Sequence, residues 1–125
     1  MHFDKKDIEI YLQGVWDAID AGKYQIAPRP KNRELLTDYI ISEREELDII
    51  KSLTPMDFSD AVSNDHRGRE YEILYIFGKD INLLERFANQ ERTVSLYIKY
   101  NKSSDQYLFV ISFHEQEHPL SYYFK

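Results

Sequence analysis

The stretch that decides the fold is TVSLYIKYNKSSDQYLFVISFH, residues 93–114. Two runs rich in β-branched and aromatic residues flank the polar connection NKSSD, which is typical of a β-hairpin. One register places large apolar residues opposite each other on a single face, with Val94, Leu96, Ile98 and Tyr100 facing Phe113, Ile111, Phe109 and Tyr107. The other face is mixed and carries Ser95, Tyr97, Lys99, Ser112 and His114. We therefore expect an antiparallel hairpin with its apolar face against the core and its mixed face open or partly open.

The N-terminal half reads as helices. Asp4 is a suitable N-cap, Gly22 is a natural stop, and between them Ile8, Leu12, Val15 and Ile19 form one helical stripe. Residues 23–29, KYQIAPR, predict a short extended segment at a sheet edge. Further helices are expected to begin at Asn32, at the capping box formed by Ser42 and Glu45, and at Thr54.

The remaining segments complete an α+β prediction. The stretch from 57 to 68 ends in a polar loop, SNDHRGR. Residues 71–77 read as a buried strand ended by Gly78, and 82–89 as a helical turn in a long connection. Together with the hairpin, these elements predict one domain over residues 1–125. Its N-terminal helices would pack on one face of a C-terminal, mainly antiparallel sheet.

Composition narrows the possible functions. The 125 residues include 42% hydrophobic residues and no cysteine, so disulfides, thiolate metal sites and a cysteine nucleophile are excluded. No apolar run approaches the roughly 20 residues that span a bilayer, so no membrane partner is expected. Acidic residues near the N-terminus do not suit a signal peptide, and a reducing compartment such as the cytoplasm fits. The balance of 16 basic against 22 acidic residues, a net charge of −6, means that nucleic-acid binding requires a local basic patch.

Residues 114–118, HEQEH, match the H-E-x-x-H pattern of zinc proteases. In those enzymes the two histidines share one face of a helix. Here the pattern begins at the end of a predicted strand, and Pro119 biases His118 away from helical backbone angles. We therefore interpret the match as coincidental and expect no metal or other cofactor.

Three side chains on the mixed face suit metal-free RNA cleavage. His114 is able to take or give a proton near neutral pH, Tyr97 is able to orient or donate, and Lys99 supplies a cation for a phosphate. The expected register, however, pairs Tyr97 with Val110 and sets it four residues from His114, roughly 13 Å by strand rise. By spacing alone, a solvated sheet face with a terminal histidine remains the stronger interpretation.

Other charged residues fall into three groups, each with a plain solvated alternative. Basic residues flank two loops, with Arg29, Lys31 and Arg33 in one and His66, Arg67 and Arg69 in the other. Either loop is able to grip phosphates. Glu72 is either an exposed sheet carboxylate or an acid–base group. The acidic run of Glu43, Glu45, Glu46 and Asp48 is expected to be a hydrated helix face, or a surface for a basic partner.

Several segments together resemble a known family. They are LTPMDF (53–58), YIFGKDI (75–81), LYIKY (96–100) and ISFHE (111–115). In this order, after an N-terminal helix, they are similar to the MqsR family of type II toxin–antitoxin toxins, in the branch found in Gram-positive bacteria and their mobile elements. The resemblance spans essentially the whole chain. It implies a RelE-like fold and a metal-independent endoribonuclease that cleaves mRNA without the ribosome. It also implies a neutralising antitoxin, often zinc-binding with a helix-turn-helix domain.

The resemblance also implies roles for individual residues. The family's active-site tyrosine and lysine fall on Tyr97 and Lys99, its basic residue in the last strand falls on His114, and a glutamine falls approximately on Glu72. A family lysine falls on Asp60, which cannot perform the same task.

Two hypotheses follow. In the first, the chain is an mRNA-cleaving toxin whose candidate catalytic residues are His114, Tyr97, Lys99 and Glu72, with RNA-binding candidates Arg67, Arg69 and Arg29. In the alternative, the chain is a non-catalytic module that binds a basic protein through its acidic helices.

Overall fold

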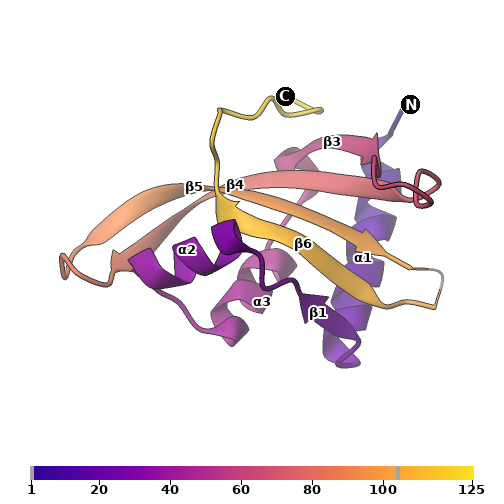
Figure 1. Ribbon diagram of the computed structural model, residues 1–125. Helices are drawn as coiled ribbons and strands as arrows, with labels where there is room; N and C mark the ends of the chain where they lie inside the picture. Colours follow the sequence, from indigo (N-terminus) through magenta and orange to yellow (C-terminus); the bar gives the residue numbers. More distant parts are fainter. Residues whose placement is uncertain (1, 104) are drawn as a thin grey trace.

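The computed structural model describes residues 2–103 and 105–125, so Ser104 in the predicted polar connection lies outside the described residues. Figure 1 shows a curled sheet with α1 and α3 behind it. In the described chain the helices are α1 (Lys5–Asp20), α2 (Pro30–Asp38), α3 (Glu43–Lys51) and the 3-10 turn η1 (Pro55–Asp57). The strands are β1 (Tyr24–Ile26), β2 (Tyr39–Ile40), β3 (Phe58–Ser63), β4 (Ile73–Glu85), β5 (Glu91–Lys102) and β6 (Leu108–Glu115). The predicted α+β class is confirmed.

The sheet is mixed, with strand order β1-β6-β5-β4-β2 and with β3 also paired to β4. Strand β1 runs parallel to β6, and the other pairs are antiparallel. The sheet's inner face buries Leu96 and Ile98 of β5 and Phe113 of β6 against α1 and α3. The predicted stripe of α1 is buried there too, which confirms the first helix and its orientation. One face of the sheet is therefore covered by the core, and the other face carries Tyr97, Lys99 and His114.

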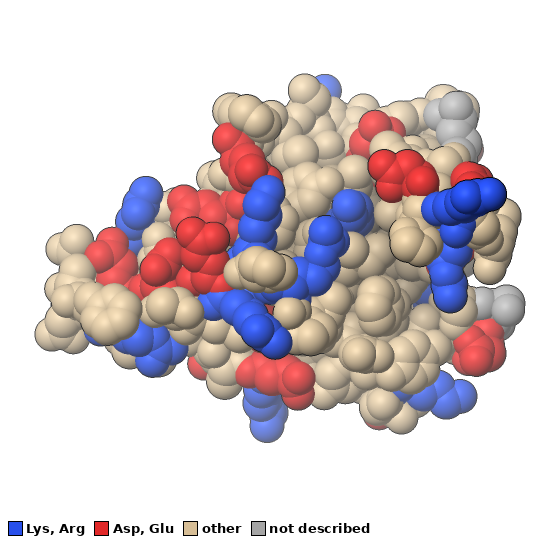
Figure 2. Space-filling model, in the orientation of Figure 1, with Lys and Arg blue, Asp and Glu red and all other residues tan. Residues whose placement is uncertain are grey.

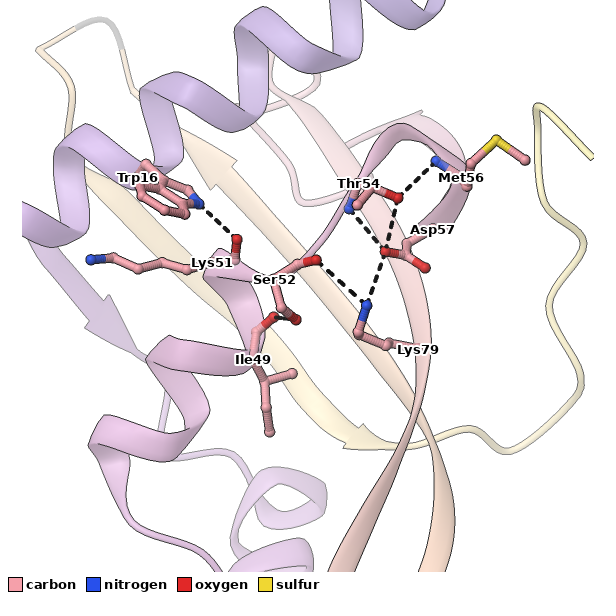
Figure 3. A network of polar contacts seen from close by, with 8 residues as sticks. All are labelled: Trp16, Ile49, Lys51, Ser52, Thr54, Met56, Asp57 and Lys79. Atoms are coloured by element: carbon pink, nitrogen blue, oxygen red, sulfur yellow. Dashed lines mark hydrogen bonds and ion pairs between the residues drawn. The ribbon is translucent and has the colours of Figure 1, made fainter.

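A polar network fixes the helical layer to the strands (Figure 3). The indole N–H of Trp16 donates to the carbonyl of Lys51 at 2.7 Å, which joins α1 to α3. Further along, the Lys79 ammonium of β4 reaches the Ser52 carbonyl at 3.5 Å and the Asp57 carboxylate at 3.4 Å. Because both Lys79 and Asp57 are largely shielded from solvent, their pairing ties η1 to β4 more firmly than a surface ion pair does.

Helix α2 begins earlier than predicted, and Asn32 is not its cap. The helix starts at Pro30 with Arg29 as N-cap residue, because proline suits the first helical position. Asn32 is instead buried in the first turn and donates to the carbonyls of Ala27 (2.8 Å) and Ile111 (3.1 Å). It also accepts from the backbone N–H of Phe113 at 2.9 Å. One side-chain amide therefore continues the edge pairing of β6 where the three-residue strand β1 ends.

Two further sequence predictions in the second half are wrong, and one strand was not predicted. Strand β3 precedes the predicted polar loop, and the predicted helical turn over 82–89 is the end of β4 and its turn into β5. The strand does not stop at Gly78, because β4 continues through it in register with β5 to Leu84. Long cross-strand pairing overrides the weak local helix signal of this segment.

Gly78 accommodates the C-terminal tail, residues 116–125, on the outer face of the sheet. A Cβ atom at position 78 would lie 2.5 Å from the Tyr122 hydroxyl and 2.7 Å from Leu120 Cδ1. The tail is anchored where the Gln116 N–H donates to the Ser95 carbonyl at 2.8 Å and the Tyr123 N–H donates to the Phe58 carbonyl at 2.9 Å. It thus crosses β5 and β4 toward β3, as Figure 1 shows in yellow.

Among the residues that the structure describes, no helix has the length and apolar character needed to cross a bilayer.

Candidate functional site

Tyr97 and His114 face each other directly across β5 and β6. Their rings are stacked, with centroids 5.2 Å apart and planes inclined by 15°. The expected pairing of Tyr97 with Val110 is therefore wrong by four residues. The inferred separation of roughly 13 Å, which weakened the argument for joint action, does not exist.

A bulge corrects a second expectation about the hairpin. Lys99 pairs with Ser112 but Tyr100 pairs with Val110, so Ile111 has no partner on β5. As a result Leu108 and Val110 point into the core, whereas Tyr107 and Phe109 are each 39% exposed on the outer face. The prediction had placed these two aromatic side chains inward. A continuous apolar run from Leu108 to Ile111 gives no alternation from which to choose.

The mixed face forms the floor of an open cavity of about 520 Å³, which we call the reactive pocket. Its floor is Tyr97, Lys99, Ser112 and His114; α2 supplies one wall with Arg29–Asn32, and the tail supplies the other with Glu117–Leu120. Figure 2 shows Lys and Arg side chains gathered near the middle of this face, beside a cluster of Asp and Glu side chains. The local basic patch that RNA binding requires is therefore present on an acidic protein.

The backbone sets the proton arrangement of His114. Its Nδ1 lies 2.8 Å from the Glu115 carbonyl oxygen. A carbonyl oxygen only accepts hydrogen bonds, so this contact places a proton on Nδ1. In the neutral imidazole, Nε2 is then the nitrogen that is free to accept a proton from a bound molecule.

Burial shifts the pKa values of Tyr97 and Lys99, the two residues of β5 that lie beside His114. Desolvation raises the pKa of Tyr97 above its ordinary value; Arg29 lowers it and Glu117 raises it. The phenol is therefore protonated at neutral pH and is able to donate a hydrogen bond or a proton, but is not a base there. Desolvation also lowers the pKa of Lys99, Arg29 lowers it further, and Asp65 raises it. Lys99 and Arg29 thus repel each other, and an anion between them would relieve that repulsion.

An ion pair between Lys31 of α2 and Glu117 of the tail joins the two walls of the reactive pocket. Both side chains are more than half exposed, so the pair adds little stability. Its effect on the site is electrostatic, because Glu117 engages one of the cations that line the cavity.

The remaining predicted site residues lie elsewhere. Glu72 is held by the Arg69 guanidinium at 3.0 Å and by the Asn101 amide, beside a different cavity. Arg67 is exposed in the loop before β4 and does not line the reactive pocket. Asp60 is exposed on β3, paired in register with Ile76, and does not line this pocket either. The structure thus brings together His114, Tyr97, Lys99 and Arg29, and it separates them from Glu72, Arg67 and Arg69.

The H-E-x-x-H match does not form a helical metal site. His114 belongs to β6, and His118 lies in the non-helical tail beyond Glu115. Among the residues that the structure describes, no group of three or more His, Asp or Glu side chains is arranged to hold a metal ion.

Sequence reasoning missed the tail wall and its acidic residue, Glu117. The one available signal was Gly78 inside an apolar strand, because such a glycine marks close approach by another segment. Its partner segment was not predictable from local pattern.

Comparisons of the chain with protein-family models, with curated proteins and with solved structures find no match. The chemistry of the reactive pocket is therefore the basis for a functional proposal.

Proposed function

We propose that the chain is a metal-independent endoribonuclease that cleaves single-stranded mRNA at the reactive pocket. The observation that carries this proposal is the stacking of Tyr97 on His114, 5.2 Å between centroids, with Lys99 and Arg29 lining the same cavity. RNA cleavage without a metal requires a base, an acid and positive charge at the phosphate, which an imidazole, a phenol and two cations are able to supply.

In the proposed reaction, each of these groups has a separate role. His114 Nε2 takes the proton of a ribose 2′-hydroxyl, whose oxygen attacks the adjacent phosphorus. The bond from phosphorus to the 5′-oxygen breaks, and the leaving oxygen receives a proton donated by Tyr97 or by water. The products are a 2′,3′-cyclic phosphate and a 5′-hydroxyl end, so the reaction consumes no water and no oxidant. Lys99 and Arg29 offset the charge that builds up on the phosphate oxygens.

The test uses a single-stranded RNA 20-mer in EDTA with purified wild-type protein, His114→Ala and His2→Ala. His2→Ala is the matched control, because it removes an exposed imidazole outside the reactive pocket. We expect wild-type and His2→Ala to produce cyclic-phosphate ends, and His114→Ala to cleave at least about 100-fold more slowly. A copy of the substrate with 2′-deoxyribose at the cut positions should resist cleavage.

Two results would overturn the proposal. One is a folded wild-type protein that leaves the RNA intact in EDTA but cleaves when Mg²⁺ or Zn²⁺ is restored, or never cleaves. The other is a folded His114→Ala protein that cleaves at the wild-type rate.

We propose further that this nuclease is a RelE-like toxin of the MqsR type, paired with an antitoxin. The support is the resemblance of YIFGKDI, LYIKY and ISFHE to that family. Induced expression should then arrest bacterial growth, and a neighbouring small gene with paired C-x-x-C motifs and a helix-turn-helix should relieve the arrest. Growth that continues during expression of folded wild-type protein argues against a toxin.

The alternative is a non-catalytic module that binds a basic protein through its acidic helices. Part of the acidic surface that it needs is buried. Glu46 is 4% exposed, so the acidic face of α3 consists of Glu43, Glu45 and Asp48. Glu43 also accepts a hydrogen bond from the Tyr24 hydroxyl at 3.2 Å. This alternative predicts no RNA cleavage in the EDTA experiment.

A further inference from the structure

A second cavity of about 450 Å³ opens on the outer face of the same hairpin. It is lined by Asn101 of β5, by Phe109 and Ile111 of β6, by Tyr107 of the connection between these strands, and by Arg69 and Glu72 of the loop before β4. We call it the second pocket. The proposed cleavage mechanism does not use any of these residues.

The floor of the second pocket is aromatic and accessible. Phe109 pairs directly with Asn101 across the hairpin, and 39% of its surface is exposed. Tyr107 is equally exposed, and its hydroxyl donates to the Tyr24 carbonyl at 3.1 Å, which fixes the ring against β1. A flat, exposed phenyl ring beside an amide is suited to stacking a planar heterocycle whose edge needs hydrogen bonds.

The polar rim of the second pocket is pre-organised. Glu72 is only 14% exposed, and its two carboxylate oxygens engage Arg69 (3.0 Å) and the side-chain amide of Asn101. Asn101 therefore keeps its amide oxygen and one N–H available to a ligand. Glu72, which was predicted as a catalytic candidate, thus orients Asn101 at this rim.

The two pockets are consecutive along the hairpin. Lys99 lines the reactive pocket and Asn101, two residues on, lines the second, a spacing of roughly 7 Å along the strand. On β6, the adjacent residues Ser112 and Ile111 line the two pockets in the same order. The bulge at Ile111 is what turns Phe109 outward and so creates the second pocket. Cations and aromatic rings therefore follow each other along one face, which is the arrangement that binds single-stranded nucleic acid.

We propose that the second pocket binds an unstacked nucleobase of the RNA, next to the phosphate held in the reactive pocket. The base stacks on Phe109, and Asn101, held by Glu72, contacts its edge. This inference rests on the proposed endoribonuclease function and names the element that positions the substrate strand. A nucleobase is favoured over a side chain of a protein partner, because neighbouring residues of one hairpin line the second pocket and the cavity that holds Lys99 and Arg29.

The test measures binding separately from cleavage. The probes are fluorescein-labelled heptamers with 2′-O-methyl ribose at every position, one for each of the four bases, and a matched heptamer without bases. The 2′-O-methyl groups block cleavage, so wild-type protein is usable. Anisotropy is measured for wild-type, Phe109→Ala, Phe109→Tyr and Phe87→Ala. Phe87→Ala is the matched control, since Phe87 is 82% exposed at the turn between β4 and β5 and lines neither pocket.

We expect Phe109→Ala to weaken binding of at least one base-containing heptamer by about ten-fold, because the stack is lost. Phe109→Tyr, which keeps the ring, and Phe87→Ala should both bind within about two-fold of wild-type. The heptamer without bases should bind wild-type and Phe109→Ala equally.

The proposal is overturned if folded Phe109→Ala binds every heptamer as wild-type does, or if wild-type binds none of them. The proposal is also overturned if Phe109→Ala weakens binding of the heptamer without bases as much as it weakens binding of the base-containing heptamers. The result is independent of catalysis: binding that depends on Phe109 without cleavage of ordinary RNA refutes the nuclease alone. Cleavage by wild-type with no effect of Phe109→Ala on heptamer binding refutes the base site alone.

Discussion

The ring of Tyr97 lies flat against the imidazole of His114, with 15° between their planes, because the two residues are direct cross-strand partners. The stack holds the imidazole while the Glu115 carbonyl fixes the proton on Nδ1. Tyr97 is therefore a packing surface for His114 and, in the proposed reaction, has a separable second role as a proton donor.

Substitution of Tyr97 separates these roles. Tyr97→Phe keeps the stack and removes the hydroxyl, so we expect RNA cleavage to fall by about 10- to 100-fold without a change in melting temperature. Tyr97→Ala should lose at least as much activity and also lower the melting temperature. Single-turnover cleavage and thermal unfolding measure the two effects. If Tyr97→Phe cleaves RNA at the wild-type rate, the Tyr97 hydroxyl takes no part in the mechanism.

Glu117 should restrain RNA binding, since it occupies Lys31 at the rim of the reactive pocket. We expect Glu117→Gln to bind a non-cleavable RNA heptamer about three- to five-fold more tightly at low salt, with the gain shrinking as salt is added. Glu9→Gln on α1 removes an equal charge outside the reactive pocket and serves as the control. Equal affinities of the two variants would contradict this account.

Asn32 should be the most sensitive polar residue of the fold, because it is 4% exposed and makes three hydrogen bonds with backbone groups. Asn32→Ala leaves the Phe113 N–H without this partner, so we expect a loss of about 2–3 kcal/mol in the free energy of unfolding. Urea denaturation measures it. The control Asn82→Ala removes an exposed amide that accepts from Thr93 and should cost less than about 0.5 kcal/mol.

Glu46 should make stability depend on pH. Burial, and then Glu43, raise the pKa of Glu46 in the folded protein from 4.5 to about 7. The folded state then binds this proton more tightly than the unfolded chain does, so its contribution to stability is present below pH 4.5 and lost as the pH rises to about 7. Glu46→Gln should therefore be about 1–2 kcal/mol more stable than wild-type at pH 8, after allowance for solvent screening, and close to it at pH 4.

Chemical denaturation of both proteins at pH 4 and pH 8 gives that comparison. A Glu46→Gln protein that is no more stable than wild-type at pH 8 would mean that the carboxylate finds compensation in the folded state.

Much of the local structure was predictable from sequence because the signals are local. The stripe that begins at Ile8 and the capping box of Ser42 and Glu45 predicted α1 and α3, and the structure confirms both. Strand β3 and the far half of β4 were missed, because polar residues such as Asp60 and Asn82 conceal strands that long-range pairing stabilises.

The sequence by itself determined that Tyr97, Lys99 and His114 share the uncovered face of a C-terminal hairpin. It did not determine their neighbours. Side chains alternate with a period of two, so the expected pairing of Tyr97 with Val110 and the observed pairing with His114, four residues apart, place Tyr97 and His114 on the same face. The faces differ only on the other side of the bulge, where Val110 lies in the core. The observed pairing is accompanied by contacts between residues distant in the chain and by one irregularity in the strand. These are the amide of Asn32 on the edge of β6, the tail lying over Gly78, and the bulge at Ile111. Those contacts bring the imidazole to the phenol and turn Phe109 outward, which is why the site is a property of the tertiary structure.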